Sequence, residues 1–227
     1  MHAMSAFATT AAFAFPPRRM APEQLDVVAA TIAKLVDAQR DLRIEAIDAA
    51  HCELGDEQLQ KLLVSTRGAW LRKLNLSRNS FTQAGAVTLA AELLPPTLVR
   101  MYPPPALWRS LCKLDLSGWP LGDEGCFQLP LHCKGLTTLL LSQVSLTDAG
   151  APFLHRVLSN LPSLRCLSLV RNKLGPRSMI ALAEAIRLGS PLESLDLAWN
   201  NIGDSLADVV RAVSEVGRKG AGWGIGA

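Results

Sequence analysis

The chain has 227 residues and a mass of 24.4 kDa, which is enough for one domain with a sizeable core. Apolar residues make up 49% of it and charged residues 19%, so the composition excludes a chain that is disordered throughout. The formal charge of +3, from 23 basic and 20 acidic residues, is too balanced to indicate nucleic acid or an anionic membrane as a partner.

The N-terminal part is expected to be a disordered tail over 1–21, followed by a capping helix over 22–43. Met1–Met20 contains no acidic residue, and no positive charge precedes its apolar stretch, which argues against a secretory signal. A cleaved targeting segment is the alternative for this tail. In the capping helix, Leu25 and Ile32 fall on one side, which would cover the first coil of the repeats that follow.

A leucine pattern organises the rest of the chain, over 44–217. Its clearest copy begins at Leu71 and has the frame LxxLxLxxNxL, with Asn79 at the ninth position. Further copies begin at residues 111, 136, 164 and 192, and a degenerate first copy begins at residue 44. The starting points are separated by 27, 40, 25, 28 and 28 residues. Six copies in register predict a repeat architecture, whereas a single LxxLxL would indicate little.

Each copy of the frame predicts a strand followed by a helix. Apolar residues at the fourth and sixth positions lie on one face of a strand, because strand side chains alternate. Three- and four-residue apolar spacings then predict an amphipathic helix. The expected N-caps of these helices are Asp56, Thr82, Asp123, Thr147 and Asp204. Looser turns are expected where Cys52, Trp119 or Val144 replaces the asparagine. The predicted fold class is therefore an α/β solenoid with parallel strands on the concave face and helices on the convex face.

With this frame the chain resembles leucine-rich repeat proteins of the ribonuclease-inhibitor-like class, which also occur in NOD-like receptors and in Ran GTPase-activating protein. The resemblance covers residues 44–217. It implies a curved horseshoe with about six strands, and a protein partner bound on the concave face and the adjoining loops.

Two segments depart from the repeat. A proline-rich insertion over 95–110 accounts for the spacing of 40 residues, and its five prolines predict an extended segment that loops out. The end of the chain, over 218–227, is glycine-rich and is expected to be flexible. Pro130 interrupts the helix of the third copy, which is therefore expected to be short.

Motifs for catalysis or metal binding are not found. The five cysteines include no CxxC pair, and the four histidines fall in different repeats or in the tail. The phosphate-binding, dinucleotide-binding, GxSxG and HExxH motifs are all missing from the sequence. The chain is therefore expected to be no enzyme and to hold no metal or cofactor. Unpaired thiols favour a reducing compartment, so the expected location is the cytoplasm, or the nucleus, rather than the mitochondrion.

Candidate binding residues lie between the leucines, where strand side chains point away from the core, and in the turns that follow. They are Arg72, Lys73, Asn75, Arg78, Lys113, Asp115, Arg165, Ser168, Arg171, Asp196 and Trp199. Arginine and tryptophan are over-represented among binding hot spots, and Trp199 is expected beside Arg171 of the preceding coil. The alternative for any one of them is an ordinary solvated strand face.

The leading hypothesis is a non-catalytic scaffold or adaptor that binds a protein partner, with no nucleic acid and no membrane. Two alternatives stay open: a GTPase-activating regulator similar to Ran GTPase-activating protein, and the sensing portion of a NOD-like receptor. The Ran GTPase-activating proteins carry an acidic C-terminal tail, whereas the C-terminal end of this chain is glycine-rich and contains Arg218 and Lys219. The sequence leaves the partner's identity and the oligomeric state open.

Overall fold

A computed structural model describes residues 10–15, 22–38, 43–67, 69–92, 110–129 and 133–215. Within these ranges seven strands form one parallel sheet, in which spatial order follows chain order. The strands are β1 (Thr10–Ala14), β2 (Arg43–Asp48), β3 (Trp70–Asn75), β4 (Lys113–Asp115), β5 (Thr138–Leu140), β6 (Cys166–Ser168) and β7 (Ser194–Asp196). The frame places these strands in register, so that Leu74, Leu114, Leu139, Leu167 and Leu195 form one row across the sheet.

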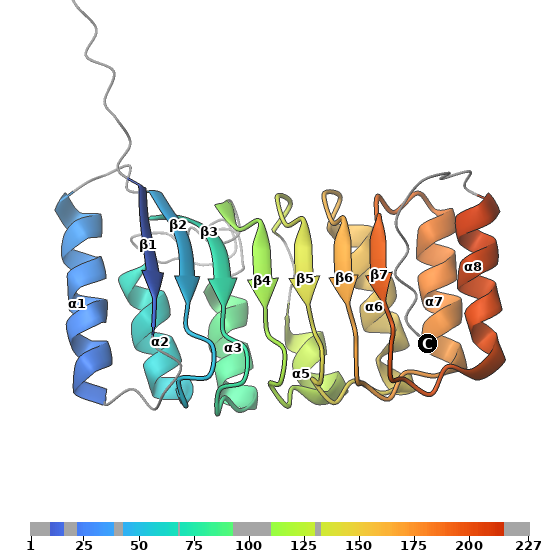
Figure 1. Cartoon of the computed structure of the whole chain (residues 1–227), viewed down its shortest axis with the longest axis horizontal. Helices are drawn as coiled ribbons and strands as arrows, with labels where there is room; N and C mark the ends of the chain where they lie inside the picture. Colours follow the sequence, from blue (N-terminus) through green and yellow to red (C-terminus); the bar gives the residue numbers. More distant parts are fainter. Residues whose placement is uncertain are drawn as a thin grey trace, which may run out of the picture.

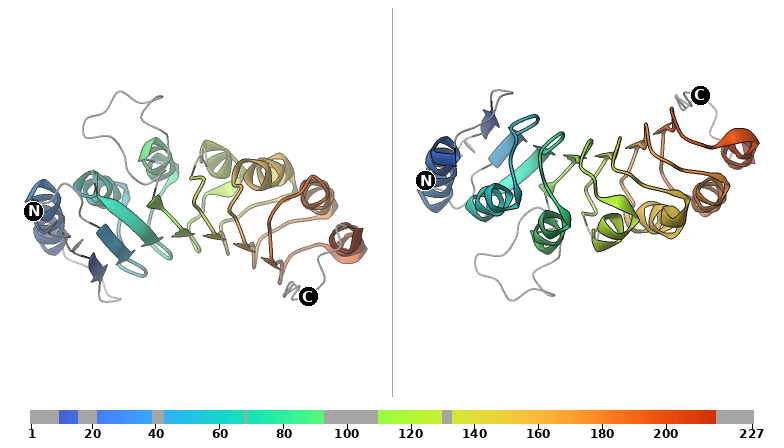
Figure 2. Two further views of the ribbon diagram at one scale, coloured as in Figure 1. Left: turned by 90° about the horizontal axis from the view of Figure 1, so that it is seen from above. Right: turned by 90° about the horizontal axis from the view of Figure 1, so that it is seen from below.

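A helix follows each strand and packs on the same side of the sheet. The helices are α1 (Pro22–Ala38), α2 (Asp56–Ser65), α3 (Gln83–Glu92), α5 (Gly122–Gln128), α6 (Ala151–Asn160), α7 (Pro176–Arg187) and α8 (Leu206–Glu215). Short 3₁₀ turns at Asp148–Gly150 and Gly203–Ser205 lead into α6 and α8. The elements progress along one axis, with the strands lining the inner side and the helices the outer side (Figures 1 and 2). The predicted α/β leucine-rich repeat solenoid is confirmed, and α5 is the short third helix.

The core lies between the sheet and the helices and is continuous from coil to coil. Leu139 and Leu141, at the fourth and sixth positions of their frame, have no exposed surface. Phe153 and Leu154 of α6 close the same coil from the helix side, and both are fully buried. No single coil encloses its leucines, so each depends on its neighbours for burial.

Asparagine side chains join the turns of neighbouring coils. The Asn172 side-chain oxygen accepts hydrogen bonds from the Val144 and Leu146 N–H groups, both at 3.1 Å. Its amide nitrogen donates to the Leu141 and Leu169 carbonyls. Each asparagine therefore satisfies the turn of the coil before it as well as its own.

The expectation of looser turns without asparagine does not hold for the main chain. At the coil of Trp119 the Gly118 N–H still donates to the Ser142 carbonyl, at 2.7 Å. The Trp119 ring is fully buried at the position that asparagine occupies in other coils, with its centre 4.7 Å from that of the Phe81 ring. Its indole N–H donates to the Thr82 carbonyl. A buried aromatic ring replaces the polar contacts of the asparagine, and the main-chain hydrogen bonds continue.

Three of the five expected helix caps are wrong: Asp204 lies inside the 3₁₀ turn Gly203–Ser205, and two others have a different role. Thr82 and Thr147 do cap their helices, through Ala84 and Ala149. The carboxylate of Asp56 instead reaches the next coil, where it accepts hydrogen bonds from the Thr82 N–H and hydroxyl, and Asp123 does the same at Thr147. This contact requires a glycine in the next helix. A Cβ at Gly85 would lie 2.4 Å from an Asp56 carboxylate oxygen.

The prediction of a disordered tail over 1–21 is wrong for Thr10–Ala14, which forms β1 beside β2. Phe13 and Phe15 alternate with small residues and direct their rings to the core, and the Phe15 N–H donates to the Asp48 carbonyl at 2.8 Å. The free edge of β2 thus gains a partner, and the sheet has one strand more than the six expected. The capping helix corresponds to α1, in which Leu25 and Ile32 are fully buried.

Other expectations fall outside the described residues. They concern most of the insertion over 95–110 and the glycine-rich end over 218–227.

Candidate functional site

The turn after each of the strands β2–β7 places one residue at the edge of the concave face. We call this row the loop ridge; it consists of His51, Arg78, Gly118, Gln143, Arg171 and Trp199. All six have positive φ angles, between 53° and 60° for the five that are not glycine. Such a backbone costs a non-glycine residue about 1–3 kcal/mol. The same strained conformation recurs in successive coils and aligns the side chains as a single exposed row.

The C-terminal end of the loop ridge holds its largest aromatic group. The guanidinium of Arg171 lies over the Trp199 ring, 5.6 Å from the ring centre. The Trp199 side chain is 72% exposed, although it is a large apolar group. The predicted adjacency of these two residues is therefore present. It makes a flat aromatic surface with a positive charge on one side.

The acidic and amide groups in the middle of the concave strands have local partners. Asp115 accepts a hydrogen bond from the Ser117 N–H two residues later, at 2.9 Å. Asn75 and Asp196 make the same contact with the N–H groups of Ser77 and Ala198. These contacts stabilise the turn after each strand, a common role of Asp and Asn. The three candidates are half-buried and present one face of the side chain to solvent.

Three of the basic candidates are paired with acids from an outer coil. Lys73 lies 2.8 Å and Arg72 3.6 Å from the carboxylate of Glu45 on β2. The hydrogen bond from Lys73 lowers the pKa of Glu45, so this carboxylate stays ionised. Arg165 lies 3.1 Å from Glu193 and also donates to the Pro191 carbonyl.

The remaining candidates face the concave side with fewer contacts. Lys113 is exposed and lies opposite Lys73 on the neighbouring strand. Arg78 is exposed and leans over the next coil, where a Cβ at Gly118 would meet its side chain at 3.0 Å. The Ser168 hydroxyl lies 3.0 Å from that of Ser142. The eleven candidates thus lie on the strand face, directly beside it or on the loop ridge.

The cysteines and histidines do not form a metal site in the part of the chain that is described. No group of three or more potential ligands occurs there. Burial raises the pKa of the Cys126 and Cys133 thiols to about 12, which keeps them protonated. Cys52 is buried whereas the adjacent His51 is exposed, so this dipeptide presents no joint site. None of the helices within the described ranges is long and apolar enough to cross a lipid bilayer.

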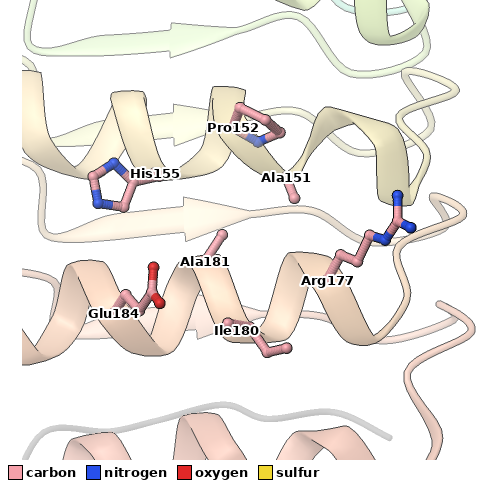
Figure 3. A pocket seen from close by; sticks show the side chains of 7 residues that line it. All are labelled: Ala151, Pro152, His155, Arg177, Ile180, Ala181 and Glu184. Carbon is pink, nitrogen blue, oxygen red and sulfur yellow. The ribbon is translucent and has the colours of Figure 1, made fainter.

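A depression also lies on the convex side, between α6 and α7. It is an open groove of about 460 Å³, with His155 of α6 facing Glu184 of α7 near one end and Arg177 near the other (Figure 3). Ile180 of α7, which also lines the groove, is 49% exposed. This groove could not be predicted from the sequence, because it arises where two helices pack side by side.

Sequence reasoning also missed the acids that pair with the basic candidates. Glu45 and Glu193 occupy the second position of their frames, as Arg72 and Arg165 do in the neighbouring coils. Residues at equal frame positions become neighbours across a parallel sheet, and this rule would have identified both pairs.

The fold and the concave surface define a repeat protein of a known class. The family model described as "Leucine Rich repeat" matches residues 69–90, 160–183 and 190–205. The ribonuclease inhibitor of Sus scrofa is 32% identical over 189 residues, a match that covers 71% of this chain and 40% of the relative. The ribonuclease inhibitor of Mus musculus is 29% identical over 177 residues, covering 64% of this chain and 37% of the relative.

A further relative has a different domain composition. The "NACHT, LRR and PYD domains-containing protein 2" of Homo sapiens is 30% identical over 165 residues, which covers 69% of this chain and 14% of the relative. The chain belongs to the leucine-rich repeat proteins, and its repeats are of the ribonuclease-inhibitor-like class. It spans less than half the length of each of these relatives.

Proposed function

We propose that the chain is a non-catalytic scaffold or adaptor that binds a protein partner on its concave face and loop ridge. The observation that carries this proposal is the Arg171–Trp199 pair, in which Trp199 is exposed at the edge of the sheet face that points away from the helices. Covering a large aromatic ring that is exposed to water lowers the free energy of the complex. Arginine and tryptophan also supply a large share of the binding energy in protein interfaces.

The repeat itself supports the same function. Small side chains follow the strands at Ser77, Ser117 and Ser142, so a partner can approach the sheet closely. Two of the relatives are named for inhibiting ribonucleases, and inhibition of this kind requires contact between two proteins. Cys112, Cys126 and Cys166 are free thiols, which supports a reducing compartment such as the cytoplasm.

A second candidate function is the sensing portion of a larger receptor. It is favoured by the similarity to a human protein that carries NACHT and PYD domains besides its leucine-rich repeats. The GTPase-activating alternative has a direct test, since a regulator of this kind would accelerate GTP hydrolysis when added to a panel of small GTPases. A scaffold would leave every rate unchanged.

A pair of bait variants tests the location of the docking surface. Ser142→Tyr adds bulk to the concave face, and Ala30→Tyr adds the same bulk to an exposed position of α1. Partners captured by the wild-type chain and identified by mass spectrometry should be lost with Ser142→Tyr and retained with Ala30→Tyr. Thermal melts of both variants verify folding. Loss of the partner with Ala30→Tyr alone would place the docking surface on the helices instead.

A further inference from the structure

The outward side of the four central coils carries a concentrated positive charge. The outward frame positions at β3–β6 and in the turns that follow these strands carry seven basic side chains and one carboxylate, that of Asp115. The basic residues are Arg72, Lys73, Arg78, Lys113, Arg165, Arg171 and Lys173. We call this surface the central face. It carries a net +6, whereas the whole chain carries only +3.

The outward sides of the first and last coils carry negative charge. The outward side of the first coil holds Glu45, Asp48 and Glu53, and that of the last coil holds Glu193 and Asp196. A strip of positive charge is thus bounded at both ends by carboxylates. Its length is limited to four coils, a pattern that the balanced overall composition conceals.

Part of the positive charge is neutralised from these outer coils. Glu45 pairs with Arg72 and Lys73, and Glu193 pairs with Arg165. The four cations that remain are Arg78, Lys113, Arg171 and Lys173. All four are exposed, and none forms an ion pair with a carboxylate among the residues described. These four side chains are therefore available to the carboxylates of another molecule.

The spacing of the ridge cations suits an extended acidic segment. Adjacent strands lie about 4.8 Å apart, so Arg78 and Arg171, three coils apart, are separated by about 14 Å along the loop ridge. The turns keep this spacing because their main chains are hydrogen-bonded, as from Arg78 N–H to the Ser117 carbonyl at 2.7 Å. In an extended chain, residues four apart on one face are about 13 Å apart.

We propose that the partner presents a short acidic segment in extended conformation, which lies along the loop ridge across the strands. Acidic residues at positions i and i+4 of that segment pair with Arg78 and Arg171. An aromatic or apolar residue just beyond i+4 packs on Trp199. This proposal rests on the proposed function, because it specifies the chemistry of the protein that binds there.

An acidic protein segment fits this surface better than nucleic acid. A long polyanion would continue over the outer coils, where Glu53 and Asp196 would repel it. A short acidic segment ends before it reaches them. The loop ridge also lacks a series of aromatic rings on which bases could stack, since its two rings, His51 and Trp199, lie at opposite ends with none between them.

The test uses a fluorescein-labelled peptide of about twelve residues with glutamates at i and i+4 and phenylalanine at i+6. Comparison probes are the same peptide with lysines at those positions and an oligothymidylate. Anisotropy titration should show binding of the acidic peptide alone, weakening as salt rises from about 50 to about 200 mM. Tighter binding of the oligothymidylate, or no preference for glutamate over lysine, would overturn the proposal.

A matched pair of charge reversals locates the peptide. Arg78→Glu/Arg171→Glu alters the loop ridge, and Lys34→Glu/Lys134→Glu changes the net charge equally at exposed positions away from it. The ridge variant should bind the acidic peptide at least about tenfold more weakly, and the control within about twofold of wild type. Equal losses in both variants would show that net charge alone attracts the peptide, against the proposal.

The two proposals can fail separately. If the captured partner is lost with Ser142→Tyr but binds the ridge variant at full strength, the concave docking surface stands and the acidic segment is wrong. If the partner survives Ser142→Tyr, the docking surface itself is wrong.

Discussion

The inward and outward sides of the same strands obey different constraints. Leu139 and Leu141 point inward and are fully buried, and their equivalents in every other coil are apolar as well. The outward position just before the first of these two leucines is occupied by Lys113, Thr138 and Cys166 in successive coils. The inward side thus determines whether the solenoid folds. The outward side is free to vary, so it is the side on which partner recognition can be encoded.

The largest expected effect is at the inward side. Leu141→Ala should lower the free energy of unfolding by about 2–5 kcal/mol, because it removes buried methyl groups and leaves a cavity. Its neighbour Ser142 is half-buried and makes one hydroxyl contact, so Ser142→Ala should cost less than about 1 kcal/mol. Urea unfolding of the two variants measures both values. Equal losses of stability in the two variants would mean that Leu141 does not point inward and Ser142 outward.

The next effect concerns the polar part of the interior. Asn172→Ala removes the acceptor of the Val144 and Leu146 N–H groups and should cost about 1–3 kcal/mol. Asn201 is exposed in the next coil, and Asn201→Ala should change stability by less than about 0.5 kcal/mol. A cost at position 172 as small as that at position 201 would show that the asparagine link between coils contributes nothing.

A pH-dependent effect is expected where a carboxylate joins two coils. Burial alone would raise the pKa of Asp148, but hydrogen bonds from Ser178, Arg177 and Gly175 together lower it below its usual 3.8. The ionised group therefore stabilises the fold above about pH 4, and this contribution disappears as the pH falls through the lowered pKa.

The destabilisation of Asp148→Ala relative to wild type should accordingly shrink between about pH 6 and about pH 3 in urea unfolding. Ser178→Ala removes only part of the donor set and should show a smaller difference at the higher pH. A destabilisation by Asp148→Ala that is constant with pH would contradict this role of the carboxylate.

The smallest stability effect is expected at the outward edge. Trp199→Ala should change the melting temperature by no more than about 2 °C, because the 72% exposed ring contributes little to the core. A clear loss of stability would show that this ring supports its turn and is not held ready for a partner.

The regular part of the fold could be predicted because burial repeats with the frame. Even the degenerate first coil, with Ile44, Ile47 and Cys52, packs as its leucine-rich neighbours do. β1 was missed because Phe13 and Phe15 belong to no copy of the frame, although their alternation is typical of a strand. The role of Trp119 was missed as well, since a frame identifies the position of the asparagine but not what an aromatic ring can do there.

The candidate site was predictable in position but not in pairing. The frame put Arg171 and Trp199 in adjacent turns, and the structure shows them stacked. Which cations are neutralised depends on side chains reaching across strands, as Glu45 does to Lys73. The convex groove depends on how two helices pack, which a pattern along one chain does not contain.

The most direct test of the concave docking surface is titration of the captured partner against matched exposed residues. Trp199→Ala should weaken binding by about 2 kcal/mol, more than Lys113→Ala, whose charge mainly affects the association rate and salt dependence. Leu188→Ala on the convex side removes an equally exposed apolar group, at 76% against 72%, and should leave the affinity unchanged. An affinity that falls with Leu188→Ala and not with Trp199→Ala would contradict the concave docking surface.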